Sequence, residues 1–309
     1  MQQIPEGKEP SKLMVVAAFA AVYFFWGSTY IAIAIAIEST PPFMMAALRF
    51  FTAGFILYIW CILRREKTPD TFSVLKNAFA GTLMLFFGTT SLIWAEQYLP
   101  AGLCSVIVAC TPFWFVILDK KHWQNNFSDK YIIIGLAIGL AGIIMLSLGK
   151  DDINLEGSHI QLISFVLLIF GSVLWSAGSL YSKYTVSTGS TSIKASIQMM
   201  AAGIFACIVS LLSGEYNHFT WSHVTVHSWE AILYLITFGS LVGYIAYIWL
   251  LQVRPPAIVG TYAYVNPAVA LFLGWWILNE HVTAMQIIAL FIILSGVLLV
   301  NLSKYKKLP

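Results

Sequence analysis

Long apolar stretches alternate with short polar breaks along the whole chain. Ten of them approach the roughly 20 residues that an α-helix needs to cross a bilayer. The breaks contain turn-forming pairs such as Pro41-Pro42, Pro69-Asp70 and Pro255-Pro256. The pattern predicts an all-α integral membrane protein with ten transmembrane helices. The ten stretches cover residues 14–37, 43–63, 75–94, 101–118, 131–148, 160–181, 193–212, 231–251, 257–278 and 285–302.

Composition supports the membrane assignment. The chain is 59% hydrophobic and 10% charged, whereas a soluble domain carries about 25% charged residues. The first apolar stretch is too long for a cleavable signal peptide, so we expect a retained first span. All four cysteines fall inside apolar stretches, which predicts no disulfide framework. They are Cys61, Cys104, Cys110 and Cys207.

The sequence contains none of the motifs typical of hydrolases, metalloproteases or ATP-driven pumps. It has no HExxH, no Gly-x-Ser-x-Gly and no P-loop, and its six histidines lie in loops or at span ends. We therefore predict a protein that is not an enzyme and needs no metal or cofactor. Its expected partners are a small-molecule solute and membrane lipid, with no nucleic acid, and no feature predicts an oligomeric state.

The basic residues define an orientation. With the N-terminus inside the cell, 15 of the 17 lysines and arginines face the cytoplasm, Lys150 lies outside and Arg49 falls within a span. The positive-inside rule then predicts a protein of the bacterial cytoplasmic membrane with both termini in the cytoplasm. The cytoplasmic set is Lys8, Lys12, Arg64, Arg65, Lys67, Lys76, Lys120, Lys121, Lys130, Lys183, Lys194, Arg254, Lys304, Lys306 and Lys307.

The two halves of the chain resemble each other. Trp26 precedes Arg49 by 23 residues, and Trp175 precedes Gln198 by the same number. Further matches, including Pro112 with Pro267, keep their order along the chain, which argues against chance similarity between apolar helices. Each half holds five predicted spans, and an odd number inverts the second half in the membrane. Inverted repeats are the usual architecture of secondary carriers, which bind solute near the midplane between the halves.

This repeat gives a domain organisation. We expect a cytoplasmic N-terminal tail at 1–13, a first five-helix repeat at 14–149 and an outer linker at 150–159. A second five-helix repeat follows at 160–303, and a cytoplasmic tail at 304–309.

Several motifs resemble those of a known family. They are Trp26-Gly27-Ser28-Thr29-Tyr30, Glu38-Ser39, Pro41-Pro42, Met45-Ala46, Arg49-Phe50, Ala95-Glu96 before Pro100, residues 139–146 and residues 262–267. The chain resembles EamA-family members of the drug/metabolite transporter superfamily, with the pattern closest to the YedA-like exporters. The resemblance covers nearly the whole chain. It implies a ten-span, five-plus-five inverted repeat carrier in the bacterial inner membrane, whose relatives export amino acids, other small metabolites or drugs.

One corner departs from the family pattern. Many relatives place an acidic residue after the fourth span, where this chain has Lys120-Lys121-His122-Trp123. Asp119 is the nearest substitute for that acidic residue.

Arg49 is the clearest single candidate for function. It lies about two turns into the second span, and an intramembrane arginine normally faces a cavity or a partner. It could anchor an anionic group such as a carboxylate, or it could pair with Glu38 or Glu96 to lock an outer gate. The resemblance favours the gate, since relatives with unlike substrates share this arginine. Glu96 is also the one span-associated carboxylate that could carry a proton.

Aromatic and hydroxyl residues near the centres of the spans predict a solute cavity. Trp26 shares a helix face with Tyr30, and Trp175 shares one with Ser179. Helix packing and back-bonding to the carbonyl four residues earlier are the alternative explanations. The full set of expected cavity residues is Trp26, Tyr30, Thr90, Trp94, Trp175, Ser179, Tyr244, Tyr262 and Asn266.

Pro112 and Pro267 occupy matching places in the two halves. Proline frees a backbone carbonyl and kinks a helix, and carriers use such breaks as hinges. We expect both prolines to be hinges, and a static kink is the alternative.

Together these features predict a secondary transporter that exports small amphipathic metabolites, amino acids or related compounds, by alternating access. The alternative is a multidrug exporter of aromatic cations. A channel, a lipid-handling protein and a membrane enzyme fit the sequence less well.

Overall fold

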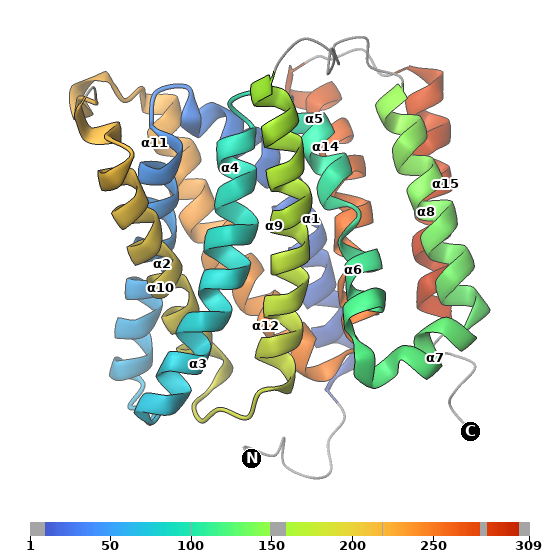
Figure 1. The fold of residues 1–309 in the computed structure, drawn as a ribbon, viewed down its shortest axis with the longest axis horizontal. Helices are drawn as coiled ribbons and strands as arrows, with labels where there is room; N and C mark the ends of the chain where they lie inside the picture. Colours follow the sequence, from blue (N-terminus) through green and yellow to red (C-terminus); the bar gives the residue numbers. More distant parts are fainter. Residues whose placement is uncertain (1–9, 100, 149–158, 218, 279–282, 303–309) are drawn as a thin grey trace.

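Helices form all the regular secondary structure in the residues that this computed structural model describes, which are 10–99, 101–148, 159–217, 219–278 and 283–302 (Figure 1). The first half contains α1 (Lys12–Ile37), α2 (Pro42–Leu63), α3 (Thr71–Gly81), η1 (Thr82–Thr90), α4 (Ser91–Ala95), α5 (Ala101–Val108), α6 (Thr111–Leu118), η2 (Lys120–His122), α7 (Trp123–Ser128) and α8 (Lys130–Leu148). The second half contains α9 (His159–Tyr184), α10 (Thr191–Leu212), η3 (Glu215–Asn217), η4 (Trp221–His223), α11 (Val226–Tyr234), η5 (Leu235–Tyr244), α12 (Ile245–Val253), α13 (Pro256–Val259), α14 (Tyr262–Leu278) and α15 (Ala284–Leu302).

Within these described ranges, seven helical segments are long and apolar enough to cross a membrane. They are Lys12–Ile37, Pro42–Leu63, Thr71–Ala95, His159–Tyr184, Thr191–Leu212, Val226–Val253 and Pro256–Leu273. Two shorter apolar helices, Lys130–Gly142 and Ile287–Val300, accompany them. The predicted all-helical, membrane-spanning character is confirmed, while the count of ten spans, the repeat and the orientation stay predictions. The predicted outer linker (150–159) and C-terminal tail (304–309) lie outside the described residues except for His159, and so do residues 1–9 of the N-terminal tail.

Local chemistry fixes where several helices begin. The Asp70 side chain accepts a hydrogen bond from Ser73 N, the Ser190 hydroxyl from Ile193 N and the Thr225 hydroxyl from Ser228 N. Each bond satisfies one of the backbone donors that the first turn of a helix leaves free. These caps explain why α3, α10 and α11 start after short polar turns.

Two helices that cross the molecule contain a wide π-helical middle. In the first half α3, η1 and α4 run on as one rod, and in the second half α11, η5 and α12 do the same (Figure 1). The π-helical turn bonds residue i to i+5, and such segments are rare and concentrate at functional sites. The two π segments change which side chains face the centre of the bundle.

Two other apolar segments are each interrupted by a short turn. The first half has a turn at residues 109–110 between α5 and α6, and the second half has one at residues 260–261 between α13 and α14. Thr111 and Thr261 each donate a hydroxyl hydrogen bond to a carbonyl three residues earlier. Pro112 lies in the first turn of α6, where proline is tolerated, while Pro267 lies inside α14. The two prolines therefore differ in local setting, and a hinge role for them stays a prediction.

Small residues allow two pairs of helices to pack backbone against backbone. A Cβ added to Gly54 would lie 2.7 Å from Met200 N, and one added to Gly203 would lie 2.5 Å from Phe51 N. In the other pair, a Cβ at Gly142 would meet Ile293 N at 2.9 Å, and one at Gly296 would meet Gly139 N at 2.6 Å. Higher numbers on one helix face lower numbers on its partner, so α2 with α10 and α8 with α15 are antiparallel pairs. Close approach of small residues is a general source of helix association in membranes.

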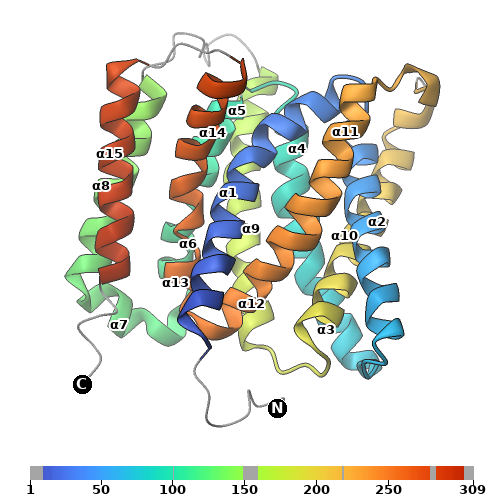
Figure 2. The ribbon, with the colours of Figure 1, turned by 180° about the vertical axis from the view of Figure 1, so that it is seen from behind.

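The core is centred on α1 and α9, and the α8–α15 pair stands to one side. α1 contacts α14, α11, η5 and α12, while α9 contacts η1, α6 and α4. Figure 2 shows α1 from the side opposite to Figure 1, with the α8–α15 pair at the edge of the bundle. This pair belongs to a second cluster of buried apolar residues, which includes Leu136, Tyr264 and Ile293.

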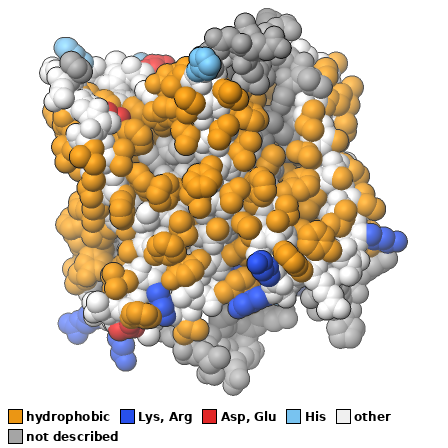
Figure 3. Space-filling view, in the orientation of Figure 1, with side chains coloured by type: hydrophobic (Ala, Val, Ile, Leu, Met, Phe, Trp, Pro, Cys, Tyr) orange, Lys and Arg blue, Asp and Glu red, His pale blue; other side chains and the backbone are white. Residues whose placement is uncertain are grey.

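The outer surface suits a lipid environment. Hydrophobic side chains cover most of the face in Figure 3, and lysines and arginines gather at its lower end. Large exposed apolar residues occur on many helices, including Trp60, Phe72, Phe170 and Phe291. Such a continuous apolar surface would be a liability in water and is expected in a bilayer.

Candidate functional site

A cavity opens between the helices of the bundle, and its space of about 690 Å³ includes open solvent at its mouth. Its walls come from both halves of the chain and combine aromatic, hydroxyl and apolar side chains with one arginine. The lining includes Trp26, Thr29, Tyr30, Arg49, Thr89, Thr111, Ser172, Trp175, Gly239, Ser240, Tyr244, Tyr262 and Asn266.

Four aromatic rings meet at one end of this cavity. The Trp26 ring lies 5.4 Å from that of Trp175, 4.9 Å from that of Tyr247 and 4.8 Å from that of Tyr262, measured between centroids. Trp26 and Trp175 come from α1 and α9, the first long helix of each half. The contacts with Trp175 and Tyr262 are edge-to-face and that with Tyr247 is tilted, and such contacts hold rings in fixed orientations. The cavity therefore has a rigid aromatic wall at the junction of the two halves.

Hydrogen bonds fix the polar edges of these rings. Trp26 Nε1 donates to the Gly239 carbonyl at 2.9 Å, and Trp175 Nε1 donates to Tyr247 Oη at 3.1 Å. Tyr247 Oη also bonds to Ser179 Oγ at 2.7 Å. Because the indole donors already have partners, the two tryptophans present their ring faces rather than hydrogen-bond donors to a solute.

A second polar chain runs behind the wall toward α3. Tyr244 Oη donates to Gln198 Oε1 at 2.7 Å, and Gln198 Nε2 donates to Asn77 Oδ1 at 3.2 Å and Ser182 Oγ at 3.1 Å. Gln198 is fully buried and lies at the position that the predicted repeat pairs with Arg49. The two halves thus use a neutral amide and a cation at matching positions.

Arg49 supplies the positive charge of the cavity. The residue is 4% exposed, Nε donates to Ser240 Oγ at 3.0 Å, and the guanidinium lies 5.0 Å from the centre of the Phe50 ring. Nη1 has no hydrogen-bond partner. Within the part of the chain that the structure describes, no carboxylate oxygen approaches the guanidinium to within 4.0 Å, and Glu38 is exposed. Arg49 therefore keeps bonding capacity that a buried cation normally has satisfied.

Asn266 offers a complementary acceptor. Its residue is 2% exposed, it lines the same cavity, and Oδ1 has no hydrogen-bond partner. An unsatisfied buried polar atom costs about 1–3 kcal/mol. The cavity therefore holds an acceptor without a donor, Asn266 Oδ1, and a donor without an acceptor, Arg49 Nη1. Together these atoms can orient a solute that carries both a donor and an acceptor.

The structure brings most of the expected cavity residues together and leaves three behind the wall. Trp26, Tyr30, Trp175, Tyr244, Tyr262 and Asn266 line the cavity, as does Arg49. Thr90 bonds to the Leu85 carbonyl at 3.2 Å, Ser179 supports Tyr247, and the Trp94 ring packs against Tyr98. None of these three, nor Glu96, belongs to the lining.

Sequence reasoning missed several lining positions. Thr89 lines the cavity in place of its neighbour Thr90, and Gly239 and Ser240 contact Trp26 and Arg49 from η5. All lie in π-helical segments, where helical spacing of 3.6 residues misplaces the face. A π segment has no sequence signature of its own, so the short run of small residues at 239–240 was the available signal.

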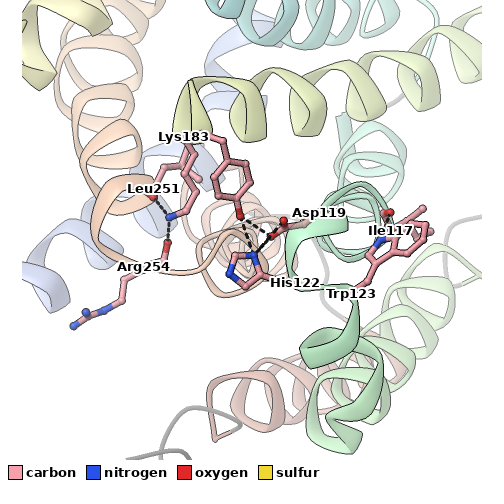
Figure 4. A network of polar contacts seen from close by, with 8 residues as sticks. Ile117, Asp119, His122, Trp123, Lys183, Leu251 and Arg254 are labelled. Atoms are coloured by element: carbon pink, nitrogen blue, oxygen red, sulfur yellow. Dashed lines mark hydrogen bonds and ion pairs between the residues drawn. The ribbon is translucent and has the colours of Figure 1, made fainter. Parts of the chain in front are cut away.

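A cluster of polar contacts joins helix ends around residues 119–123 (Figure 4). This segment follows α6 and is the one whose sequence departs from the family pattern. Asp119, 3% exposed, accepts from Tyr184 Oη at 2.8 Å, and His122 Nδ1 lies 3.1 Å from its Oδ2. Lys121 Nζ lies 4.3 Å from the centre of the Tyr184 ring. The Asp119 carboxylate thus holds the end of α9 against the turn that follows α6.

Lys183 makes a second connection at this end of the molecule. Its Nζ donates to the Arg254 carbonyl at 2.8 Å and to the Leu251 carbonyl (Figure 4). These carbonyls are at the C-terminal end of α12, which is the negative end of the helix dipole. Instead of extending freely to the interface, Lys183 ties the C-terminal end of α9 to that of α12.

A surface turn links the two halves nearby. Thr188 Oγ1 donates to Asp70 Oδ2 at 2.7 Å, and Ser73 Oγ donates to the same oxygen at 2.7 Å. These hydrogen bonds hold the pKa of the Asp70 carboxyl well below its ordinary value, and the bond from Thr188 has the largest effect. No group of three or more metal-ligating side chains occurs among the described residues.

Comparisons with known proteins agree with this architecture. The profile of the EamA-like transporter family matches the chain twice, at residues 13–148 and 162–302. The chain is 37% identical to the uncharacterized inner membrane transporter YedA of Escherichia coli (strain K12), over 95% of this chain and 92% of YedA. It is 23% identical to a probable amino-acid metabolite efflux pump of the same organism, over 89% of this chain and 90% of the pump.

Two further matches also cover nearly the whole chain. The uncharacterized transporter YvbV of Bacillus subtilis (strain 168) is 24% identical over 97% of this chain and 94% of its own. A solved crystal structure superposes with a TM-score of 0.75 over 96% of this chain and 100% of its own, at 15% identity. At that identity the superposition shows a shared fold alone.

Proposed function

Because the chain belongs to the EamA-like transporter family, we propose that it is a secondary carrier that exports small amphipathic metabolites, amino acids or related compounds, by alternating access. The protein is a multi-pass protein of the inner membrane, and its family and relatives are transporters rather than enzymes. The name of one relative, an amino-acid metabolite efflux pump, supports this class of substrate.

One observation carries the proposal: a buried arginine with a free donor shares a cavity with a wall of aromatic rings. Arg49 Nη1 has no partner, and Trp26, Trp175 and Tyr262 line the same space. A guanidinium binds a carboxylate by charge-assisted hydrogen bonds, and the rings bury an apolar group. A solute with a carboxylate at one end and an apolar body at the other satisfies both.

The proposed carrier has ten spans in two inverted repeats, with both termini in the cytoplasm. Three observations support this. The family profile matches two segments of similar length. The contact of Gly54 with Met200 mirrors that of Gly203 with Phe51, as a two-fold relation requires. Lysines and arginines gather at one end of the molecule (Figure 3).

An exporter of aromatic cations is the second candidate. The aromatic wall favours it, because cations bind the faces of tryptophan and tyrosine rings. The positive charge of Arg49 in the same cavity opposes it, since like charges repel strongly where water is excluded. The observation thus favours an anionic or zwitterionic solute.

Binding to the purified protein tests the proposal. We would measure thermal shifts with L-phenylalanine, 3-phenylpropanoate and phenethylamine, since a ligand that binds the folded state raises the melting temperature. The carboxylate-bearing compounds are expected to stabilise the wild type, and Arg49→Ala is expected to weaken their binding about tenfold to a hundredfold. Arg64→Ala, which removes an exposed arginine, is the matched control.

The same experiment separates the two candidates. Stabilisation by phenethylamine alone, kept in Arg49→Ala and lost in Trp26→Ala, would assign the cavity to cations. Trp60→Ala, at a half-exposed position, controls for the loss of a tryptophan. Saturable uptake of the stabilising compound into proteoliposomes, with counterflow, then distinguishes a carrier from a channel.

A further inference from the structure

Glu96 is a buried carboxylate that the cavity itself does not use. It follows α4, and its backbone N–H donates to the Leu92 carbonyl at 3.0 Å. Both carboxylate oxygens are shielded from solvent and have no hydrogen-bond partner. Burying a carboxylate without a partner is among the most costly arrangements in a protein.

The charged neighbour of this carboxylate is Arg49. Burial is the largest influence on both groups and opposes their charged forms, while the attraction between Arg49 and Glu96 favours those forms, although no hydrogen bond joins the two side chains. α4 packs against α9, η1, α2 and α1. Tyr30 on α1 and Cys104 on α5 also lie within the electrostatic reach of Glu96. η1 has no ionisable residue, and those of α9 lie at its two ends: His159, Tyr181, Lys183 and Tyr184.

Charge balance then links Glu96 to the solute. Without solute, one arginine and one carboxylate, both shielded from solvent, balance each other. A solute carboxylate bound at Arg49 would place two anions beside one cation. Two like charges held close together cannot both stay ionised at low cost. The least costly response is for one carboxylate to take up a proton.

We propose that Glu96 is the counter-anion of Arg49 in the solute-free carrier and takes up a proton when a solute carboxylate binds Arg49. This inference rests on the proposed function. The proton comes from water, resides on a Glu96 oxygen while the solute is bound, and leaves when the solute leaves. Solute anion and proton therefore move in the same direction, and the loaded cavity keeps the net charge of the empty one.

Proton counting tests the inference. Titration calorimetry of the wild type with 3-phenylpropanoate, in two buffers of different ionisation enthalpy at neutral pH, is expected to show uptake of about one proton per anion bound. The affinity of the wild type for 3-phenylpropanoate is expected to fall about tenfold for each unit of pH increase, over the pH range in which Glu96 is ionised before the anion binds. Glu96→Gln is expected to bind without proton uptake and with an affinity independent of pH. Glu38→Gln, at an exposed glutamate, is the matched control.

Either of two results in these titrations would overturn the inference. One is binding by the wild type without proton uptake. The other is proton uptake that persists in Glu96→Gln.

A solute-free measurement keeps the inference testable if none of the probes binds. Melting temperatures of the wild type, Arg49→Met, Glu96→Gln and the double variant form a cycle. Paired charges predict that removing both costs less than the sum of the single changes. Additive effects would refute the pairing. Failure of every probe to bind the wild type would instead count against the proposed function, so the two failures are distinguishable.

Discussion

At the scale of single residues, the two π-helical glycines of η5 determine where the functional side chains lie. A Cβ at Gly239 would lie 2.9 Å from Arg49 Nη2 and 3.1 Å from Thr29 Cγ2. A Cβ at Gly243 would lie 2.6 Å from Trp26 Nε1. Contacts under 3.0 Å require a shift, so an added methyl group at either position must move its neighbour. The missing side chains of Gly239 and Gly243 thus leave the space that the arginine and the tryptophan occupy.

This arrangement predicts different consequences for two alanine substitutions. Gly239→Ala is expected to displace the flexible guanidinium and weaken binding of 3-phenylpropanoate while changing stability little. Gly243→Ala is expected to press on the rigid indole and lower the free energy of unfolding by about 1–3 kcal/mol, as overpacking does. Thermal melts and thermal-shift titrations measure both effects. Equal loss of stability in the two variants would contradict the distinction.

The sequence singled out residues whose chemistry is costly in a membrane, and the structure places these residues in the lining of one cavity. Arg49, Trp26 and Trp175 stood out because charge and large aromatics near mid-span need a reason. Helical spacing placed Ser179 beside Trp175, and in the structure its hydroxyl bonds to Tyr247. Thr90 was expected in the cavity for its hydroxyl, but it ends the π segment η1 and bonds to the Leu85 carbonyl. Ser240 was missed because its direction depends on a π turn that composition does not encode.

At the scale of elements, the contacts of Lys183 hold together the C-terminal ends of two helices, α9 and α12. The lysine joins α9 to the last carbonyls of α12, and the neighbouring Asp119 joins α9 to the turn after α6. α9 and α12 belong to the second half, whereas α6 belongs to the first. In a carrier that alternates access, opening this end requires some of these bonds to break.

We therefore expect Lys183→Met to loosen this end of the molecule. Hydrogen exchange at the backbone amides of residues 251–259 is expected to become faster, because the carbonyls at the end of α12 lose their ammonium partner. Lys130→Met, at an exposed lysine, serves as the control. Unchanged exchange in Lys183→Met would mean that packing alone closes this end.

The turn that contains Asp70 gives a prediction about pH. Hydrogen bonds from Thr188 and Ser73 lower the pKa of Asp70 in the folded state relative to the unfolded value of about 3.9. A lowered folded pKa contributes stability above the unfolded pKa, and this stability is lost as the pH falls through the folded value. The melting-temperature difference between wild type and Asp70→Asn is thus expected to be constant above about pH 5 and to shrink below about pH 4. A difference that grows on acidification would contradict it.

At the scale of the whole molecule, the sequence pattern anticipated the helices but not their internal breaks. Segment 101–118 was predicted as one span and is two short helices, because Thr111 bonds back to Val108 beside Pro112. The corresponding turn at 260–261 lies several residues before Pro267, which is inside α14, whereas Pro112 lies in the first turn of α6, just after the turn at 109–110. Hydropathy reports the length of an apolar run, whereas a turn within that run depends on side chains that satisfy the backbone locally.

The proposed orientation of the whole molecule leads to a labelling experiment. If lysine and arginine mark the cytoplasmic end, the turn after α2 lies inside the cell and the loop before α11 lies outside. In a variant with the four native cysteines replaced, Ser222→Cys is expected to react with a membrane-impermeant thiol reagent in intact cells. Lys67→Cys is expected to react only after the membrane is opened. Both positions are exposed, so accessibility within the protein does not distinguish them. The opposite labelling pattern would mean that the carrier has the inverted orientation. The contacts of Lys183 with the end of α12 would then lie on the outer side, where their breaking would control release of the solute instead of its entry.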